Sequence, residues 1–429
     1  MSWFPIGPDD SGGWRLDIVG LLAVTGESFI HDQAEAITSS ATCLLPRLMP
    51  APQALMRARR PVALESETAK VCGVYSGVTM DTLGFFANLI HPLDELAPFS
   101  FKVLRIVYTA DLVTVRRGEA VDDLDNGGET PRLRRAKTVH GALSNFTSNS
   151  PLFESANKDV GAVLYSPLNI VAFSSFLLTI GLVGAAAYWN DGTALLGIAL
   201  ISLSTSIIGW AGWWRTDIRS RRSLSKVPDG DVVIRSREGA FILVKCSEAI
   251  ALELYAGIQE CHHRIQARAY RIFMMIGALC IMPAVVLFGN CTFNMQILVG
   301  ASYMILNLVY WLIGILPRRY HWDLSRYTVE DITPVDARNA HTVTDENDPH
   351  EGMRSFTRTL WFVIRETKRT AWVVRSGSAP STPQWRAWLD EAESAAYKTD
   401  RKWRAVRRKD EIMVMSSEEL SRAQTTHGN

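Results

Sequence analysis

The densest group of side chains that could bind a metal or move a proton is the run Cys261-His262-His263. We expect this run on a helix, because apolar residues recur at helical spacing through 247–271. Adjacent residues of a helix point about 100° apart, so one metal ion could not easily take all three side chains. The run therefore predicts an interfacial polar cluster. With His321, the two histidines are also the acids and bases that a membrane-bound enzyme with an unrecognised site would use.

A second chemical pattern is the acidic run Asp122, Asp123 and Asp125. It resembles only the start of a calcium-binding loop, because the twelfth position from Asp123 is Arg134, where such a loop needs a glutamate. We interpret it as a solvated loop. The sequence also contains no glycine-rich phosphate loop, no Gly-x-Ser-x-Gly elbow and no His-Glu-x-x-His motif. We predict no catalytic residue, no metal and no cofactor, and favour a non-enzymatic protein.

Small and polar residues line one face of two apolar segments. They are Ser202, Ser206 and Gly209 in the first segment, and Gln296, Gly300 and Asn307 in the second. Small residues let helices approach closely, and a polar side chain can bond across an interface for about 0.6 to 2 kcal/mol. We favour helix packing for these residues. The alternative is a path for a neutral solute past Gln296 and Asn307.

Basic and aromatic residues are interleaved near the C-terminus, where 354–409 contains 14 Lys plus Arg against 5 Asp plus Glu. The residues of interest are Trp385, Trp388, Arg401, Lys402, Trp403, Arg407 and Arg408. Tryptophan at headgroup depth and basic side chains near anionic lipid are typical of helices that dock on a membrane. The alternative is a helical region whose apolar face packs on the N-terminal domain.

Four apolar segments must position these residues, and none contains Asp, Glu, Lys, Arg or His. They are 168–189, 194–214, 272–289 and 294–316. As helices they are about 27 to 35 Å long, which matches a bilayer core of about 30 Å. The fold class we predict is a mainly α membrane protein with four transmembrane helices in two hairpins, 168–214 and 272–316. The absence of intramembrane charge disfavours coupling to protons or sodium ions.

The charges that flank these segments predict their orientation. Arginines and lysines follow the second segment, precede the third and follow the fourth, whereas the links 190–193 and 290–293 carry none. By the positive-inside rule, both links are outside or lumenal and both termini are cytosolic. The segment lengths leave the plasma membrane and the endomembranes equally open.

The remaining chain divides into four regions. We expect a mixed α/β cytosolic region at 1–160, with a strand candidate at 101–117, and a cytosolic loop at 215–271. Within that loop, 231–236 and 240–246 predict a β-hairpin, and 247–271 predicts an amphipathic helix that runs into the third segment. We expect 317–415 to be helical and basic, and 416–429 to be disordered.

Two helices are specific predictions within 317–415. The first spans about 356–367, and the second begins at Thr382-Pro383, an N-cap followed by a first-turn proline, and continues to about Val406.

The motifs Leu360-Trp361-Phe362, Trp372-Val373-Val374-Arg375-Ser376-Gly377-Ser378-Ala379-Pro380 and Trp385-Arg386-Ala387-Trp388-Leu389, with Trp311-Leu312, carry a resemblance. With them, the last 280 or so residues resemble a group of uncharacterised multi-pass membrane proteins of filamentous fungi. The resemblance implies a fungal membrane protein. Because the group has no assigned biochemistry, it implies no catalytic residue and no substrate.

The function we expect is that of an integral membrane scaffold or regulatory protein. It would self-associate through the small-residue faces and would contact lipid or a partner, but not nucleic acid, through the basic C-terminal helices. A transporter or channel for a neutral or amphiphilic solute is the first alternative. A membrane-bound enzyme with an unrecognised site is the second.

Overall fold

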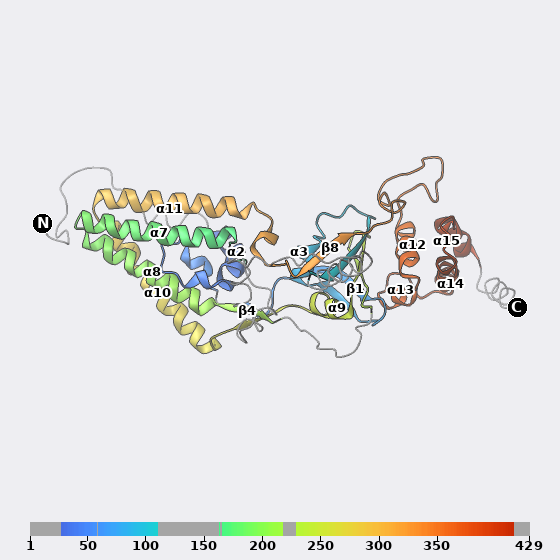
Figure 1. The fold of residues 1–429 in the computed structure, drawn as a ribbon, viewed down its shortest axis with the longest axis horizontal. Helices are drawn as coiled ribbons and strands as arrows, with labels where there is room; N and C mark the ends of the chain where they lie inside the picture. The colour runs from blue at the N-terminus through green and yellow to red at the C-terminus, as the bar shows by residue number, and fades with distance from the viewer. Residues whose placement is uncertain (1–26, 58, 110–162, 164, 218–228, 416–429) are drawn as a thin grey trace, which may run out of the picture. The chain divides into compact units, whose positions relative to one another are not determined.

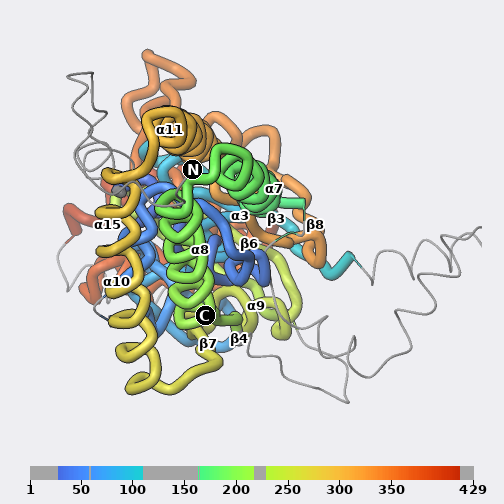
Figure 2. Tube along the Cα trace, turned by 90° about the vertical axis from the view of Figure 1, so that its left-hand side faces the viewer, coloured from blue at the N-terminus to red at the C-terminus, as the bar shows by residue number. Residues whose placement is uncertain are grey.

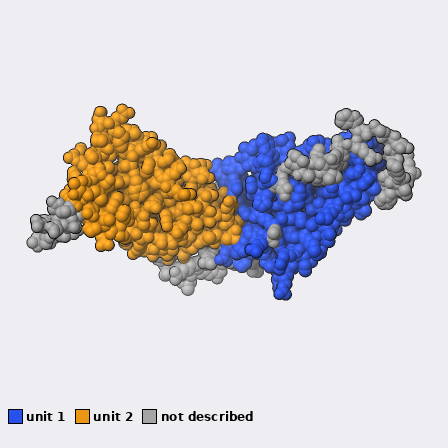
Figure 3. Space-filling model, turned by 180° about the vertical axis from the view of Figure 1, so that it is seen from behind, with its two compact units in different colours: residues 1–62, 150–217, 260–324 blue, residues 63–149, 218–259, 325–429 orange. Residues whose placement is uncertain are grey.

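The computed structural model describes residues 27–57, 59–109, 163, 165–217 and 229–415 (Figure 1). The chain forms two compact units, drawn in separate colours in Figure 3. Unit 1 comprises 1–62, 150–217 and 260–324, and unit 2 comprises 63–149, 218–259 and 325–429. The acidic run at Asp122, Arg134 and the tail 416–429 lie outside the described residues.

Within the described ranges, unit 1 is built around four long apolar helices, as predicted. They are α7 (Pro167–Tyr188), α8 (Gly192–Gly212), α10 (Ala267–Gly289) and α11 (Phe293–Gly314). Each is 21 to 23 residues long and apolar enough to cross a membrane. Helix α8 packs against both α7 and α10, and α7 packs against α11 (Figure 2). Pro283 lies inside α10, which continues to Gly289.

The first described residues of the chain belong to the same unit. They form α2 (Glu27–Ser39) and two short 3₁₀ helices, η1 (Ala41–Leu44) and η2 (Pro52–Leu55). We expected this part within a cytosolic α/β region at 1–160. Instead, α2 buries Ile30, Ala34 and Ile37 and contacts α7, α8 and α11. Burial of an apolar helix face explains why 27–62 joins the long helices.

The predicted amphipathic helix over 247–271 is wrong. The structure has α9 (Glu248–Leu254), then β7 (Glu260–His263), which pairs antiparallel with β4 (Trp214–Asp217), and α10 begins only at Ala267. Gly257 lies between α9 and β7, where it lowers helix propensity. The ladder to β4 satisfies the backbone of β7, so the chain there is extended.

The described residues of unit 2 form a six-stranded sheet in the order β2-β1-β5-β6-β3-β8. The strands are β1 (Glu67–Gly73), β2 (Thr79–Leu83), β3 (Phe101–Tyr108), β5 (Val232–Arg235), β6 (Phe241–Lys245) and β8 (Tyr327–Asp331). The pairing of β3 with β6 is parallel and the other pairings are antiparallel. The predicted hairpin is confirmed as β5 and β6. The strand candidate at 101–117 is confirmed as far as Tyr108, and its end lies outside the described residues.

One face of this sheet is covered by the C-terminal helices. They are α12 (Phe356–Thr367), α13 (Ala371–Arg375), α14 (Pro383–Tyr397) and α15 (Ala405–Val414). Phe241 and Leu243 of β6 share a buried core with Trp372 and Trp388. The predicted helix at 356–367 is confirmed, and the hydroxyl of Thr382 caps α14 as predicted. The second helix was predicted too long, because α14 ends at Tyr397 and Thr399 adopts a left-handed conformation at φ 56°.

Unit 2 also contains the short helix α3 (Phe85–Ile90), and the central strand β6 is buried on both of its faces. Along β6, Ile242 and Val244 alternate with Phe241 and Leu243, and all four are buried. A strand buried on both faces is typical of a central strand in a layered α/β domain.

Asp191, in the turn between α7 and α8, forms hydrogen bonds with the N-terminal ends of both α8 and α11. It is the N-cap of α8 and is 1% exposed. Its Oδ1 accepts hydrogen bonds from the Ala194 amide at 2.9 Å and the Thr193 hydroxyl at 2.6 Å. Its Oδ2 accepts one from the amide of Thr292, the N-cap of α11, at 2.7 Å. Burial alone would raise the pKa of Asp191, but these bonds outweigh it and hold the pKa below its ordinary value.

We expect Asp191→Ala to destabilise unit 1 by about 2 to 4 kcal/mol, because it removes a helix cap and leaves buried amides unpaired. The measurement is the midpoint of thermal unfolding in detergent, followed by tryptophan fluorescence. Asp32→Asn, at an exposed position of α2, is the matched control and should melt with the wild type. An Asp191→Ala protein that also melts with the wild type would contradict this role for the carboxylate.

Candidate functional site

A non-helical segment, 45–51, lies among the long helices of unit 1. The amide of Leu48 donates to the hydroxyl of Thr179 at 2.8 Å, and the hydroxyl of Ser175 donates to the carbonyl of Leu48. The amide of Ala51 donates to the hydroxyl of Tyr303 at 2.8 Å. Ser175 and Thr179 lie near the middle of α7, and Tyr303 lies near the middle of α11. We name 40–56 the inserted segment.

Because the inserted segment bonds to the middle of α7 and α11, its backbone groups need hydrogen-bond partners within the protein. A bilayer around these helices offers no water at mid-depth, so backbone groups that no helix satisfies must find partners within the protein. Hydroxyls of α7 and α11 supply them. Irregular backbone at this depth occurs in membrane proteins only where protein buries it or where it lines a cavity. Leu48 is 1% exposed and packs with Leu182, Ile198 and Phe288, so protein buries it here.

The inserted segment also carries a charge into the helices. Arg47 is 1% exposed, and its Nη1 donates to the carbonyl of Thr42 at 2.6 Å. Its Nε is buried and has no hydrogen-bond partner in the part of the chain that the structure describes. The long apolar segments contain no charge, so the sequence predicted none inside the membrane. An ionisable residue buried among membrane helices is costly and is a functional candidate for that reason.

The small-residue face of α8 packs on the inserted segment. Gly209 approaches η1 so closely that a Cβ there would lie 2.1 Å from the carbonyl oxygen of Cys43. Ser202 and Ser206 lie along the same helix, and both hydroxyls are buried without a partner among the described residues. The small-residue face of α8 therefore packs on the inserted segment of the same chain, and not on a helix of a second copy.

The small and polar residues of α11 do not pack on the inserted segment in the way that Gly209 does. The Nε2 of Gln296 donates to the carbonyls of Gly289 at 3.2 Å and Cys291 at 3.0 Å, where α10 ends. Gly300 is buried, and Asn307 is half-buried. Because the amide of Gln296 bonds to the backbone beside it, its geometry is that of a packing residue.

The chemical run Cys261-His262-His263 lies on β7 rather than on a helix, which corrects the expected environment. Successive strand side chains point to opposite faces, so Cys261 and His263 share a face and His262 does not. The Nε2 of His263 bonds to the carbonyl of Pro61 at 2.8 Å, and burial lowers the pKa of His263. Among the described residues, no group of three or more His, Cys, Asp or Glu could hold a metal.

One small cavity in unit 1 brings His263 together with Glu35, Arg57 and Tyr270. Its volume is about 20 Å³, which is the size of one water. Glu35 and Arg57 form an ion pair at 3.1 Å, and the Tyr270 hydroxyl donates to the carbonyl of Arg57 at 2.8 Å. Neither His262 nor His321 lines this cavity. A space of this size does not admit an organic substrate.

A cavity of about 430 Å³ in unit 2 is lined by Ser100, Asp331 and His341 among other residues. These are the residue types of a nucleophilic triad, but no hydrogen bond joins them. The hydroxyl of Ser100 and the Nδ1 of His341 are buried without a partner among the described residues, and Asp331 instead accepts bonds from Thr333. Nucleophilic catalysis needs the base within reach of the nucleophile, so this arrangement does not supply it.

Unit 2 also contains a buried polar pair, His91 and Tyr255, and an ion pair whose carboxylate, that of Glu253, is buried. His91 and Tyr255 stack with their rings 5.6 Å apart and share a hydrogen bond of 2.7 Å. Burial lowers the pKa of His91 to about 4. Glu253 accepts hydrogen bonds from Arg326 at 3.0 Å and from the hydroxyl of Tyr327 at 2.9 Å. Burial and the Glu253 carboxylate raise the pKa of Tyr327.

The C-terminal tryptophans predicted to contact lipid form an aromatic cluster inside unit 2. Trp388 is fully buried, and its Nε1 donates to the carbonyl of Ala405 at 2.9 Å. Its ring lies 5.5 Å from that of Trp385 and 5.8 Å from that of Trp403. Trp385 and Trp403 are partly buried against the same core. Insertion of Trp388 into headgroups would require unit 2 to open, so packing is the role that the structure gives it.

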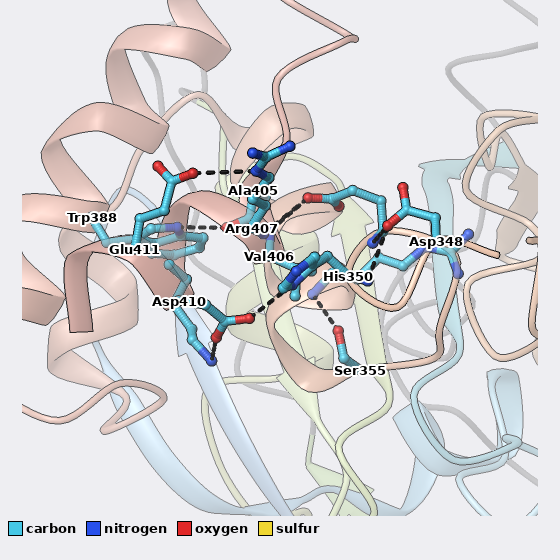
Figure 4. A network of polar contacts seen from close by, with 12 residues as sticks. Asp348, His350, Ser355, Trp388, Ala405, Val406, Arg407, Asp410 and Glu411 are labelled. Atoms are coloured by element: carbon cyan, nitrogen blue, oxygen red, sulfur yellow. Dashed lines mark hydrogen bonds and ion pairs between the residues drawn. The ribbon is translucent and has the colours of Figure 1, made fainter. Parts of the chain in front are cut away.

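The loop 345–355 forms hydrogen bonds with α15 that hold the start of this helix in place (Figure 4). The carboxylate of Glu351 accepts hydrogen bonds from the amides of Val406 at 2.8 Å and Arg407 at 3.2 Å, which caps the helix. His350 bonds to Asp410 at 3.1 Å (Figure 4). These contacts fix the orientation of the basic residues at the beginning of α15.

The basic residues predicted to contact lipid or a partner fall into two groups. Arg401, Lys402 and Arg407 are exposed, and the Nε of Arg407 forms an ion pair with Glu411 at 3.3 Å. Arg408 is half-buried and is held by both oxygens of Glu391, at 2.7 and 2.9 Å, so its charge is compensated within the unit. We name Arg401, Lys402 and Arg407 the basic surface.

Searches against models of protein families, curated proteins and solved structures gave no match to this chain.

We expect Gly209→Ala to displace η1, because the new methyl group would overlap the carbonyl of Cys43. Cys43 is 1% exposed. Its thiol should therefore react with membrane-permeant N-ethylmaleimide about tenfold faster or more, a ratio that corresponds to about 1.4 kcal/mol of local opening. Gly289→Ala is the matched control, since a Cβ there meets nothing within 4 Å. Peptide mapping by mass spectrometry separates Cys43 from the other thiols. Equal labelling of Cys43 in both variants would show that the inserted segment does not depend on Gly209.

We expect unit 2 to lose stability on acidification through His91. Its pKa in the folded protein is about 4, below an ordinary value of about 6.5. The unfolded chain therefore binds the proton more readily, and the stabilisation is complete above pH 6.5 or so and declines as the pH falls toward 4. Between pH 7 and pH 5 the loss should be about 2 kcal/mol, measured by urea unfolding. His91→Gln should remove most of this dependence, and His31→Gln, at an exposed position, should keep it. A His91→Gln protein with the wild-type pH dependence would refute the assignment.

Proposed function

We propose that this chain is an integral membrane scaffold or regulatory protein. Unit 1 anchors it, both termini are cytosolic, and the basic surface of unit 2 contacts the anionic cytosolic leaflet. The orientation rests on the arginines and lysines that flank the apolar segments.

The observation that carries the proposal is the filled interior of unit 1. The inserted segment lies among the long helices. Leu48 packs in their apolar core, and the carbonyl of Cys43 packs directly on Gly209. Gln296, the amide that best marked a solute path, bonds to backbone carbonyls. A membrane unit packed in this way supports an anchoring role more than a transport role.

The contact of unit 2 with lipid is electrostatic. Trp385, Trp388 and Trp403 pack against one another within unit 2, so these tryptophans give the basic surface no aromatic wedge. Basic side chains near an anionic leaflet contribute about 1 kcal/mol each, and salt screens the attraction beyond about 10 Å. Because Arg407 is already paired with Glu411, the three exposed residues would together contribute about 2 kcal/mol, enough to favour contact by roughly 30-fold.

Self-association is a further part of the proposal, but it would use other faces than the one first expected. The small-residue face of α8 is covered by the inserted segment. On α7, a Cβ at Gly181 or Gly184 would meet nothing within 4 Å, so that face is open to another helix.

A transporter or channel for a neutral or amphiphilic solute is the second candidate function. The observation that favours it is a set of buried polar atoms in unit 1 that have no hydrogen-bond partner among the described residues. They belong to Arg47, Ser202 and Ser206. Such groups mark solute pathways in membrane proteins when water reaches them.

We expect energy transfer between unit 2 and labelled headgroups to rise with anionic lipid. The full chain, with a fluorophore on Lys398→Cys in a Cys280→Ser background, is placed in nanodiscs of phosphatidylcholine with or without phosphatidylserine, and an acceptor dye marks the headgroups. Transfer should increase with phosphatidylserine and should fall at about 0.5 M salt.

The matched variants decide the result. Neutralising the basic surface, Arg401→Gln with Lys402→Gln and Arg407→Gln, should abolish the increase. Neutralising two other exposed basic residues of unit 2, Arg354→Gln with Lys368→Gln, should leave it. If energy transfer in the wild type does not change when phosphatidylserine is added, lipid contact by this surface is refuted.

A further inference from the structure

A cavity of about 670 Å³ opens on unit 2 at a place that the basic surface does not include. Its walls come from the first half of β1, the middle of β2, Phe99, the end of β5, the turn between β5 and β6, and the first residue of α12. A volume of this size lies within the range of about 300 to 1,000 Å³ that small-molecule sites occupy.

Three cations and two anions line this cavity, so one positive charge is in excess. Lys70 and Asp81 form an ion pair with each other, and Arg237 and Glu238 are adjacent and exposed on the turn. Arg235 is instead half-buried on β5. Within the described residues it makes no ion pair, and its one hydrogen bond is a long contact of 3.4 Å from Nη1 to the carbonyl of Gly377.

The guanidinium of Arg235 is half-buried beside an aromatic ring. It lies 5.9 Å from the ring centroid of Phe356. A guanidinium carries five N–H donors in a planar fork that matches a carboxylate or a phosphate. Donors that face a cavity and lack an acidic partner are a recognition element for an oxyanion.

The apolar wall of the cavity is held in an unusual backbone conformation. Phe99 has φ 61°, which costs a non-glycine residue about 1 to 2 kcal/mol. The hydroxyl of Thr359 donates to the carbonyl of Phe99 at 2.9 Å and holds it there. Gly239, at φ 77°, faces the ring of Phe99, and a Cβ at Gly239 would lie 3.0 Å from that ring. Two residues in the left-handed region therefore fix one wall.

We propose that this cavity binds a small aromatic carboxylate or phosphate monoester. The oxyanion pairs with the fork of Arg235, and the flat apolar group lies against Phe99 and Phe356. The site is independent of the basic surface, so either proposal can fail alone. The largest loss on mutation belongs to Arg235, and Lys70 contributes little because Asp81 already pairs with it.

The probe is phenyl phosphate, titrated by calorimetry into the full chain in nanodiscs of neutral lipid. We expect saturable binding that is at least about tenfold tighter than that of inorganic phosphate or phenol alone, because each fragment makes half of the contacts. Phosphate binding as tightly as phenyl phosphate would refute the aromatic part. No binding of phenyl phosphate up to about 10 mM would refute the site.

Variants locate the binding. Arg235→Gln should weaken it about tenfold or more, and Arg235→Lys, which keeps the charge but loses the fork, should weaken it less. Lys102→Gln, in the wall of the separate cavity near Ser100, is the control and should bind as the wild type does. If Arg235→Gln unfolds, Phe99→Leu serves as the second variant and should also weaken binding. Unchanged binding in a folded Arg235→Gln protein would overturn the proposal.

Discussion

The requirement that every backbone polar group among the long helices has a partner governs unit 1. Residues 45–51 cannot satisfy themselves, because they are not helical. Ser175, Thr179 and Tyr303 meet this demand from α7 and α11. The same demand explains polar residues that the membrane would otherwise disfavour, and the close approach at Gly209. Arg47 lies next to Leu48, whose amide and carbonyl both bond to hydroxyls of α7.

Composition alone predicted the four long helices, since an uninterrupted apolar run of their length has few other solutions. The inserted segment could not be found in that way. Pro46, Pro50 and Pro52 break the helix period, and Arg47 interrupts the apolar run. Its partners lie far along the chain, since 131 positions separate Leu48 from Thr179 and 252 separate Ala51 from Tyr303. Pairing over such distances is not visible in a local pattern. Asp191 was missed for a related reason, because only the fold brings Thr292 to it.

In unit 2, local signals predicted several elements, but the helical spacing over 247–271 was misleading, and non-local contacts were not predicted. The capping residue Thr382 predicted the start of α14 correctly, and the apolar period of 356–367 predicted α12 correctly. An apolar helix face shows that something covers it, but not what does. Trp388 therefore fitted a lipid surface as well as it fitted a protein core, and only the contacts with Trp385, Trp403 and Ala405 decide between them. The cavity at Arg235 depends on the left-handed conformation of Phe99, for which an aromatic residue gives no sequence signal.

The order of the strands couples the two units during folding. Strand β3 ends at Tyr108, and its partner β8 begins at Tyr327, after all four long helices in the chain. Strands β5 and β6 lie in the sequence between the two pairs of helices. The sheet therefore cannot be completed until the fourth helix has been synthesised, and a contact of such long range forms slowly. Until β8 arrives, one edge of β3 has unpaired amides and carbonyls, which is a template for wrong pairing. The parallel partner β6, buried on both faces, gives β3 one correct neighbour during that interval.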